Sequence, residues 1–252
     1  MGNFTGQTGT SMDVIFQGNT CANSHPNNII GGGGLTLATQ GTYTFNVSGN
    51  SFRDADGSAI TLFKASSGTS FSGVIRNNTI GAAGVVGSGS KTGNGIFLTA
   101  AGSGTISLTI DNNNIRQYLG NAGIYLDNTG GNYAVNLNIT GNTTAEPGAS
   151  AFSGLALAAG APGTGDTIPV CANITGNNFS AGDPSNSNDV IVGVSTGGSS
   201  MRLPGYSGST VADVQNFILG NNNLAGTTVT AYFDAPATAT SFVGGAACVT
   251  PP

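Results

Sequence analysis

One stretch near the middle of the chain decides the fold: Thr105-Ile106-Ser107-Leu108-Thr109-Ile110-Asp111-Asn112-Asn113-Asn114-Ile115. Its first six residues alternate polar and apolar side chains, which is the period of a strand with one buried face. The asparagines that follow interrupt this alternation, and asparagine tolerates the left-handed backbone of a tight turn. The stretch therefore predicts a half-buried strand that ends in an asparagine turn.

The same pattern recurs along the chain, with an apolar residue three positions before each asparagine and Gly or Asn directly before it. The aligned residues are Asn19, Asn50, Asn78, Asn113, Asn142 and Asn177, at spacings of 31, 28, 35, 29 and 35 residues. Strands with the pattern Gly-apolar-any-apolar lie between them, as at 95–98, 123–126 and 154–157. Each repeat therefore predicts a strand, an asparagine turn, a second strand and a loop of variable length.

A chain that coils around an axis stacks equivalent strands into parallel sheets about 4.8 Å apart. Identical residues then form columns, and an asparagine amide can hydrogen-bond to the asparagine of the next coil. We therefore expect the six aligned asparagines to form a ladder, internal at Asn78, Asn113 and Asn142. The alternative is that the Gly-Asn pairs mark hairpin turns of an antiparallel sandwich. Hairpins would not require a fixed apolar residue before each asparagine.

These asparagine-marked coils of about 30 residues resemble the right-handed parallel β-helix, or pectin-lyase-like, superfamily. The resemblance covers roughly residues 12–200, and it implies an all-β solenoid of about six or seven coils over residues 1–200. The repeats also resemble the Gly/Asn/Thr-rich β-helical regions of large bacterial surface and secreted proteins. The repeat motif is generic, so the resemblance informs the fold far more than the function.

The last part of the chain predicts a C-terminal cap over residues 201–252. Thr210 followed by Asp213 is a helix-start signature, apolar residues then recur at helical spacing, and Gly220 is a natural stop. We expect a helix at about 210–219 and a last strand at about 228–233. Alternatively, Asn221–Asn223 continues the asparagine column at a spacing of 45. The segment 202–206, with its Leu-Pro-Gly-Tyr sequence, resembles one that ends similar bacterial β-helix regions.

Composition excludes several classes of protein. Only 7% of the 252 residues are charged and the formal net charge is −5, so the basic footprint of a nucleic-acid binder is missing. No apolar run of 18 or more residues occurs, so we expect no membrane insertion. The N-terminus shows neither a signal-peptide pattern nor a cap for the first coil. We therefore expect the rest of a longer parent chain as a partner there.

The sequence holds little catalytic chemistry. The only histidine, His25, lies in a polar loop, no Arg-x-Lys stretch occurs, and the acids are dispersed at Asp111, Asp127, Asp166, Asp183 and Asp189. Residues 30 apart become neighbours in a coil, so convergence of these acids stays open. We name no catalytic residue and no cofactor. Asp54 and Asp56 are a weak calcium candidate, because their loop is half of a calcium-binding pattern. A polar turn is the alternative.

The most informative feature is aromatic. The middle residue of the Gly-apolar-any-apolar strand points outward, so Phe97 and Tyr125 should stack on one outer face, about 5 Å apart. Tyr118 and Tyr133 flank the same coil and complete the candidate ligand-binding set. Flat rings on a solenoid face suit a glycan or a cell-surface protein partner. A long loop that covers the rings is the alternative. The other strand exposes hydroxyl and amide groups but lacks the regular Thr-x-Thr columns of an ice-binding face.

The three cysteines predict that a disulfide attaches the C-terminal segment to the coils. Counting back from inward-facing Ile174 makes Cys171 outward, at the end where the cap docks, and Cys248 lies in the final segment. We expect a Cys171–Cys248 disulfide and a free Cys21, which is about five coils away. A disulfide indicates an oxidising compartment. Three unpaired thiols in a reducing compartment are the alternative.

From the sequence, we expect a non-enzymatic structural or adhesive module of a secreted or surface-displayed bacterial protein. Its location would be extracellular or on the bacterial cell surface, and glycans are its expected contacts. A polysaccharide lyase or glycoside hydrolase of the β-helix type is the alternative. That alternative requires acids and a base to converge in one groove.

Overall fold

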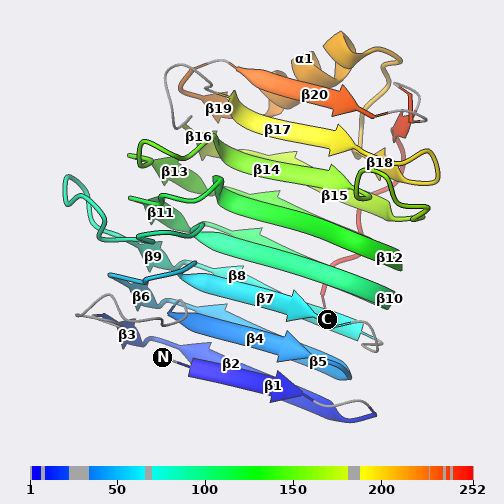
Figure 1. Cartoon of the computed structure of the whole chain (residues 1–252). Coiled ribbons are helices and arrows are strands. Elements are labelled where there is room, and N and C mark those ends of the chain that lie inside the picture. Colours follow the sequence, from blue (N-terminus) through cyan, green and yellow to red (C-terminus); the bar gives the residue numbers. More distant parts are fainter. Residues whose placement is uncertain are drawn as a thin grey trace.

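The computed structural model describes residues 2–6, 9–22, 34–65, 70–180, 188–226, 228–234, 237–238 and 241–251 (Figure 1). The strands pair in parallel and stack coil upon coil into a β-solenoid, with a short helix near the C-terminal end. The predicted all-β solenoid is confirmed. The antiparallel hairpin alternative is wrong, because every strand pairing among the described residues is parallel.

Each coil contributes strands to three faces. The first face contains the first parts of the long strands β10 and β12 together with the shorter strands β1 (Gly2–Gly6), β4 (Leu35–Thr39), β7 (Ile60–Lys64), β14 (Ser153–Ala159), β17 (Asn188–Val194) and β20 (Val229–Phe233). The second face contains the remaining parts of these two long strands, β10 (Ile96–Asp111) and β12 (Ala122–Thr140), with β2 (Ser11–Gln17), β5 (Thr42–Ser48), β8 (Ser70–Arg76), β15 (Pro169–Thr175), β18 (Ser200–Arg202) and β21 (Phe242–Val243).

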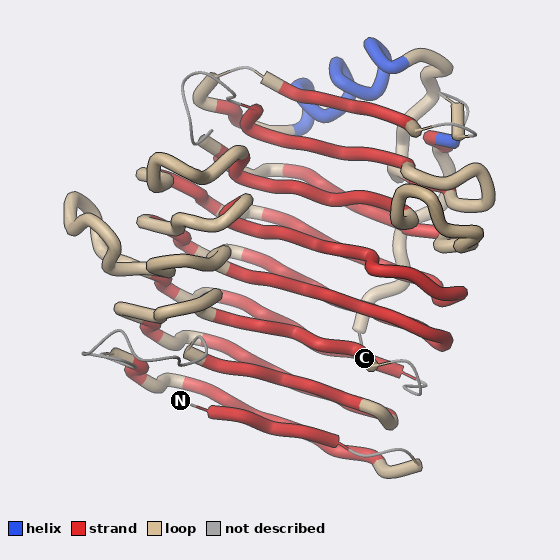
Figure 2. Tube along the Cα trace, in the orientation of Figure 1, coloured by secondary structure: helices blue, strands red, loops and turns tan. Residues whose placement is uncertain are grey.

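The third face is a separate seven-stranded sheet of short strands that follow the asparagine turns. Its members are β3 (Thr20–Cys21), β6 (Ser51–Phe52), β9 (Thr79–Ile80), β11 (Asn114–Arg116), β13 (Thr143–Ala145), β16 (Asn178–Phe179) and β19 (Asn223–Leu224). Figure 2 shows the longest loops projecting beside this face, while the helix lies at one end of the stack. No helix among the described residues has both the length and the apolar character needed to cross a membrane.

Columns of apolar side chains fill the solenoid interior. On the first face, Leu37, Leu62, Leu98, Leu126, Leu157 and Val192 lie in register and are nearly fully buried. On the second face, Val47, Ile75, Ile110, Ile139 and Ile174 do the same. Each rung of such a column buries a branched side chain worth about 1.5–3 kcal/mol of transfer free energy. The alternation of polar and apolar residues in the sequence therefore has one cause in every coil, which is the burial of every second side chain in the solenoid interior.

The predicted asparagine ladder is confirmed. The Nδ2 group of each member donates to Oδ1 of the member in the next coil at 2.9–3.2 Å, and its backbone N–H donates to the same oxygen at 2.9–3.1 Å. From Asn50 onward, Nδ2 also donates to a carbonyl of the preceding coil at 2.7–3.0 Å. Asn50, Asn78, Asn113, Asn142 and Asn177 are buried.

The residue before each ladder asparagine carries the left-handed backbone. Its φ lies between +54° and +67° at Gly18, Gly49, Asn77, Asn112, Gly141 and Gly176. Only Gly and, at moderate cost, Asn adopt this conformation readily. The sequence argument was right about the kind of turn, and the structure assigns the strain to the first residue of the pair and the hydrogen bonding to the second.

The C-terminal segment both forms a helix and continues the ladder. Helix α1 (Val211–Asn221) has Thr210 as its N-cap, with a capping box to Asp213, as predicted, and it ends two residues later than expected. Asn222 then accepts from Asn177 at 2.9 Å, so the helix and the column, which the sequence posed as alternatives, coexist. Nδ2 of Asn222 also donates to the helix carbonyl of Ile218 at 2.9 Å. The helix thereby closes the last rung, and strand β20 extends the first face beyond it.

A disulfide attaches the C-terminal segment to the solenoid, as predicted. Cys171 and Cys248 form a disulfide across 77 residues of sequence, and Cys21 is a free thiol. Beyond the disulfide the tail crosses the second face, where the Val249 N–H donates to Oδ1 of Asn136 at 3.4 Å (Figure 1). The disulfide indicates a protein that works outside the cytoplasm. The covered hydroxyl and amide face is consequently not a flat, open surface.

Replacing a central ladder residue, Asn113→Ala, should lower the free energy of unfolding by about 1–3 kcal/mol for each buried group left unpaired. The groups at risk are the backbone and side-chain N–H donors of Asn78 and the carbonyl of Ile75, whereas the Asn142 oxygen keeps the backbone N–H of residue 113 as a donor. Chemical denaturation measures the effect. Asn178→Ala is the matched control, because Asn178 adjoins a ladder residue but is exposed. Equal stability of Asn113→Ala and the parent would contradict a structural ladder.

Replacing Cys248 by Ser should lower the free energy of unfolding by about 4 kcal/mol, because the cross-link no longer restricts a long loop in the unfolded chain. Denaturation of oxidised protein measures the loss. Cys21→Ser should unfold like the parent. Mass spectrometry of non-reduced peptides checks the pairing itself, and any linkage of Cys21 within the chain would contradict this attachment of the C-terminal segment.

Candidate functional site

The first face carries two outward columns of side chains that run across successive coils. One column holds Thr61, Phe97, Tyr125, Ala156, Ile191 and Thr230 in register. The other, two residues further along each strand, includes Asp127 on β12, Ala158 on β14, Gly193 on β17 and Tyr232 on β20. The candidate site lies where these columns change from aromatic residues, such as Tyr125, to small residues, such as Ala156 and Ala158.

Phe97 and Tyr125 form the predicted stacked pair, which we call the aromatic platform. Their ring centroids lie 5.6 Å apart and the rings are inclined by 18°. Both side chains are half-buried rather than covered. The parallel register of β10 and β12 holds the two residues directly opposite each other, so the platform is fixed by the backbone.

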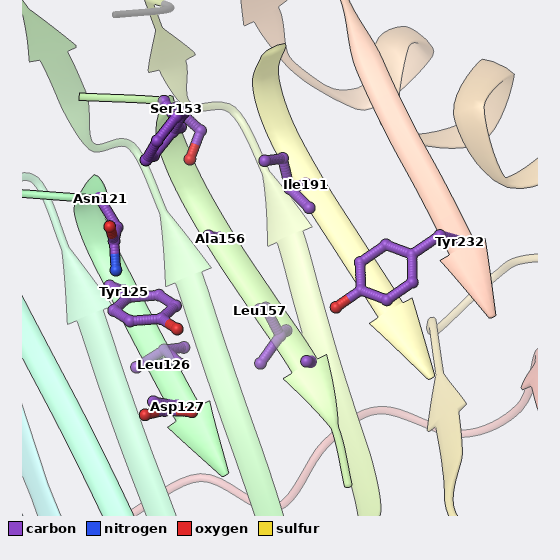
Figure 3. A pocket seen from close by; sticks show the side chains of 11 residues that line it. Asn121, Tyr125, Leu126, Asp127, Ser153, Ala156, Leu157, Ile191 and Tyr232 are labelled. Atoms are coloured by element: carbon purple, nitrogen blue, oxygen red, sulfur yellow. The ribbon is translucent and has the colours of Figure 1, made fainter. Parts of the chain in front are cut away.

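A hollow of about 230 Å³ adjoins the platform and shares Tyr125 with it (Figure 3). Its floor is formed by the small residues Ala156 and Ala158 and its far wall by Tyr232. Gly193 is required here, because a Cβ at this position would lie 2.1 Å from Cζ of the Tyr232 ring. The ring of Tyr232 therefore lies across β17 toward β14 and narrows the hollow.

Three polar residues line the hollow, and Figure 3 shows Asn121 and Asp127 on either side of Tyr125 along β12 and the turn before it. The third, Ser153, is fully buried, and its hydroxyl has no hydrogen-bond partner among the described residues. A buried hydroxyl without a partner is rare in proteins. Ser153 is therefore an unsatisfied polar group in the wall of the hollow.

Burial controls the ionisation of the site. Desolvation raises the pKa of Asp127 above its ordinary value. Desolvation first, and the Asp127 charge second, raise the pKa of Tyr125, and burial likewise raises the pKa of Tyr232. Both phenols are thus neutral near pH 7, where they supply flat, uncharged surfaces.

Tyr118 and Tyr133 are wrong as surface candidates, because both are buried in the interior. The Tyr118 hydroxyl donates to the Ser180 carbonyl at 3.2 Å and the Tyr133 hydroxyl donates to the Ala100 carbonyl at 3.0 Å. Nζ of Lys64, itself buried, lies 5.6 Å above the Tyr133 ring. Burial lowers the pKa of Lys64. These residues stabilise the corners of the coils instead of facing a ligand.

The dispersed acids do not gather in the hollow within the described part of the chain. Oδ1 of Asp166 accepts from the Gly131 N–H and Oδ2 of buried Asp189 accepts from the Gly226 N–H, so both hold loops. Asp111 lies on the second face, 3.7 Å from Arg76. His25 and Asp183 lie outside the described residues.

The calcium candidate gains no further ligand. Asp54 occupies a left-handed turn position with φ of 55°, and the carbonyl of Asp56 accepts from the Thr92 hydroxyl. Across the described ranges, no three His, Cys, Asp or Glu side chains come close enough to share a metal ion. The pair stays an untested prediction, with the turn as its visible role.

Sequence reasoning missed Tyr232, Ser153, Asn121 and the small floor. A strand at about 228–233 was expected, and its alternation already places residue 232 outward. The overlooked feature is that Ala158 and Gly193 have small side chains or none beside Tyr232. Their place in one column follows only from the register of the strands. Comparison of the chain with models of protein families, with curated proteins and with solved structures found no match.

The raised pKa of Asp127 predicts a pH-dependent stability difference. The folded state holds this proton more tightly than the unfolded state, so the stabilising contribution is present at low pH and is lost as the pH rises. Asp127→Asn should therefore melt at a higher temperature than the parent at pH 7, and the advantage should vanish near pH 3.

Asp213→Asn is the control of opposite sign. Hydrogen bonds from the Ser209 N–H and from Thr210 lower the pKa of Asp213, so its contribution is present above the ordinary pKa and disappears as the pH falls. This variant should be less stable than the parent at pH 7 and equal to it at low pH. If the melting temperatures of Asp127→Asn and the parent change with pH in the same way, the burial of the Asp127 carboxyl is contradicted.

Proposed function

We propose that the chain is a non-enzymatic, adhesive β-solenoid module that contacts glycans through the aromatic platform of Phe97 and Tyr125. The observation that carries the proposal is the stacked, half-exposed pair on a flat sheet face beside a hollow with polar groups. Flat aromatic surface gives large contact area at little conformational cost. A sugar ring presents a matching flat C–H face and a rim of hydroxyl groups.

The arrangement of acids supports binding over cleavage. Glycoside hydrolysis uses two carboxylates that flank the scissile bond. Of the described residues that line the hollow, only Asp127 carries a carboxylate. The lyase or hydrolase alternative has no specific observation in its favour.

The setting we propose is a secreted or surface-displayed bacterial protein, and the chain's relation to the right-handed, pectin-lyase-like superfamily is part of the same proposal. The disulfide and the low content of charged residues support an extracellular surface. The stacked coils supply a long, stiff body, which suits a module that presents a binding face away from its anchorage.

A glycan-array screen followed by calorimetric titration tests the proposal. Phe97→Ala and Tyr125→Ala should each weaken binding about tenfold, which corresponds to a loss of about 1.4 kcal/mol. Phe233→Ala is the matched control, because Phe233 is an exposed phenylalanine that does not line the hollow. Reducing-sugar and unsaturated-product assays run on the same glycans should stay blank. Product formation, or binding that survives both platform variants, would contradict the proposal.

A further inference from the structure

The hollow has the size of one ring-shaped group. Its volume of about 230 Å³ lies below the 300–1,000 Å³ of pockets that hold drug-sized ligands. Tyr125 and Tyr232 stand on strands three positions apart, or roughly 14 Å, and the Tyr232 ring leans over Gly193 into that gap.

The polar groups of the hollow suit a ligand with hydroxyl groups. The buried Ser153 hydroxyl has no partner among the described residues and can donate or accept one hydrogen bond. When it is ionised, Asp127 can accept hydrogen bonds but cannot donate one, whereas the Asn121 amide can both donate and accept. A ligand hydroxyl is a donor and an acceptor, so adjacent hydroxyls on one ring can satisfy all three groups.

The charge of the hollow selects against acidic ligands. None of the described lining residues is Lys or Arg. Lys64 lies on β7, two strands from β12; it is buried, and its ammonium donates to the carbonyls of Ala101 and Ser103. A ligand carboxylate in the hollow would therefore lie close to the partly desolvated carboxylate of Asp127 without a compensating cation. Two like charges that are close together and partly removed from water repel strongly.

From these observations we infer that the hollow is a specificity subsite that takes one uncharged sugar unit of the bound glycan and rejects uronic acids. Tyr125 and Tyr232 enclose the ring, and Ser153, Asp127 and Asn121 bind its hydroxyls. The inference rests on the proposed function, since the platform holds the neighbouring part of the same glycan. It adds the substrate class, which is neutral rather than polyuronate.

Calorimetric titration with cellohexaose, xylohexaose, mannohexaose and hexagalacturonate tests the inference on the full chain. At least one neutral hexasaccharide should bind, and hexagalacturonate should bind at least tenfold more weakly. Ala158→Leu fills the floor and should weaken neutral binding at least tenfold. Thr36→Leu is its matched control, because Thr36 points outward on the same face at β4, away from the hollow.

Two further variants separate a ligand role from a structural one. Ser153→Ala should weaken neutral binding about fivefold with an unchanged melting temperature, since the hydroxyl has no partner in the described protein to lose. Asp127→Asn should bring hexagalacturonate to within threefold of the neutral ligand, because the repulsive charge is gone.

The outcomes distinguish the two proposals. If none of the four ligands binds and the glycan array is also blank, the proposed function fails and this inference fails with it. If Phe97→Ala abolishes binding while Ala158→Leu and Ser153→Ala bind like the parent, the platform stands and the subsite is overturned. Equal affinity of the parent for hexagalacturonate and the neutral ligand also overturns it. Full affinity for a free monosaccharide, unaffected by Phe97→Ala, overturns the link to a glycan chain.

Discussion

The asparagine ladder is the interaction on which the rest of the structure depends. A parallel coil must turn a corner at the same place every time, and the backbone N–H of the asparagine at that corner donates to a side-chain oxygen of the next coil instead of to a backbone carbonyl. Each ladder asparagine supplies two donors and one doubly used acceptor at this point, so the buried corner is satisfied within the column. A corner fixed in this way sets the register of the strands on both sides of it, and through them the columns of Leu, Ile and Val.

The ladder also explains why the proposed binding face is ordered. Phe97 and Tyr125 are held opposite each other only because β10 and β12 share one register, and that register passes unbroken from corner to corner. Side chains on rigid strands lose little freedom on binding a ligand. The closing bond from Asn222 to the carbonyl of Ile218 extends the same order to the last coil, where β20 places Tyr232. The site therefore spans four strands yet needs no separate framework of its own.

Much of the fold could be predicted from the sequence because its signals are local and repeated. The asparagine column, the alternating strands, the capping box of Thr210 and the outward Cys171 all follow from spacing within a few residues. The sequence placed Asn222 in the column only as an alternative to the helix, because the inserted helix lengthens the spacing to 45 residues and obscures the periodicity. Tyr118 and Tyr133 were misplaced because they lie at corners, where alternation no longer tells inside from outside. The hollow was missed because it depends on residues in four different coils, whose register no single segment reveals.

A regular sheet face offers the same surface at every coil, so specificity must come from departures from regularity. On the first face the departure is a loss of bulk: Ala156, Ala158 and Gly193 occupy positions where neighbouring coils carry Tyr125, Asp127 and Tyr232. Removing side chains from a rigid face leaves a void with fixed walls, since the backbone cannot collapse without breaking the ladder. Ser153, which lines the same void, has a buried hydroxyl without a hydrogen-bond partner among the described residues. A single carboxylate at its edge has a large effect on a face that is otherwise almost free of charge, because nothing nearby screens or compensates it. Under the proposed function, selectivity on such a scaffold arises from the side chains that are absent and from Asp127, the one charged residue among the described residues that line the hollow.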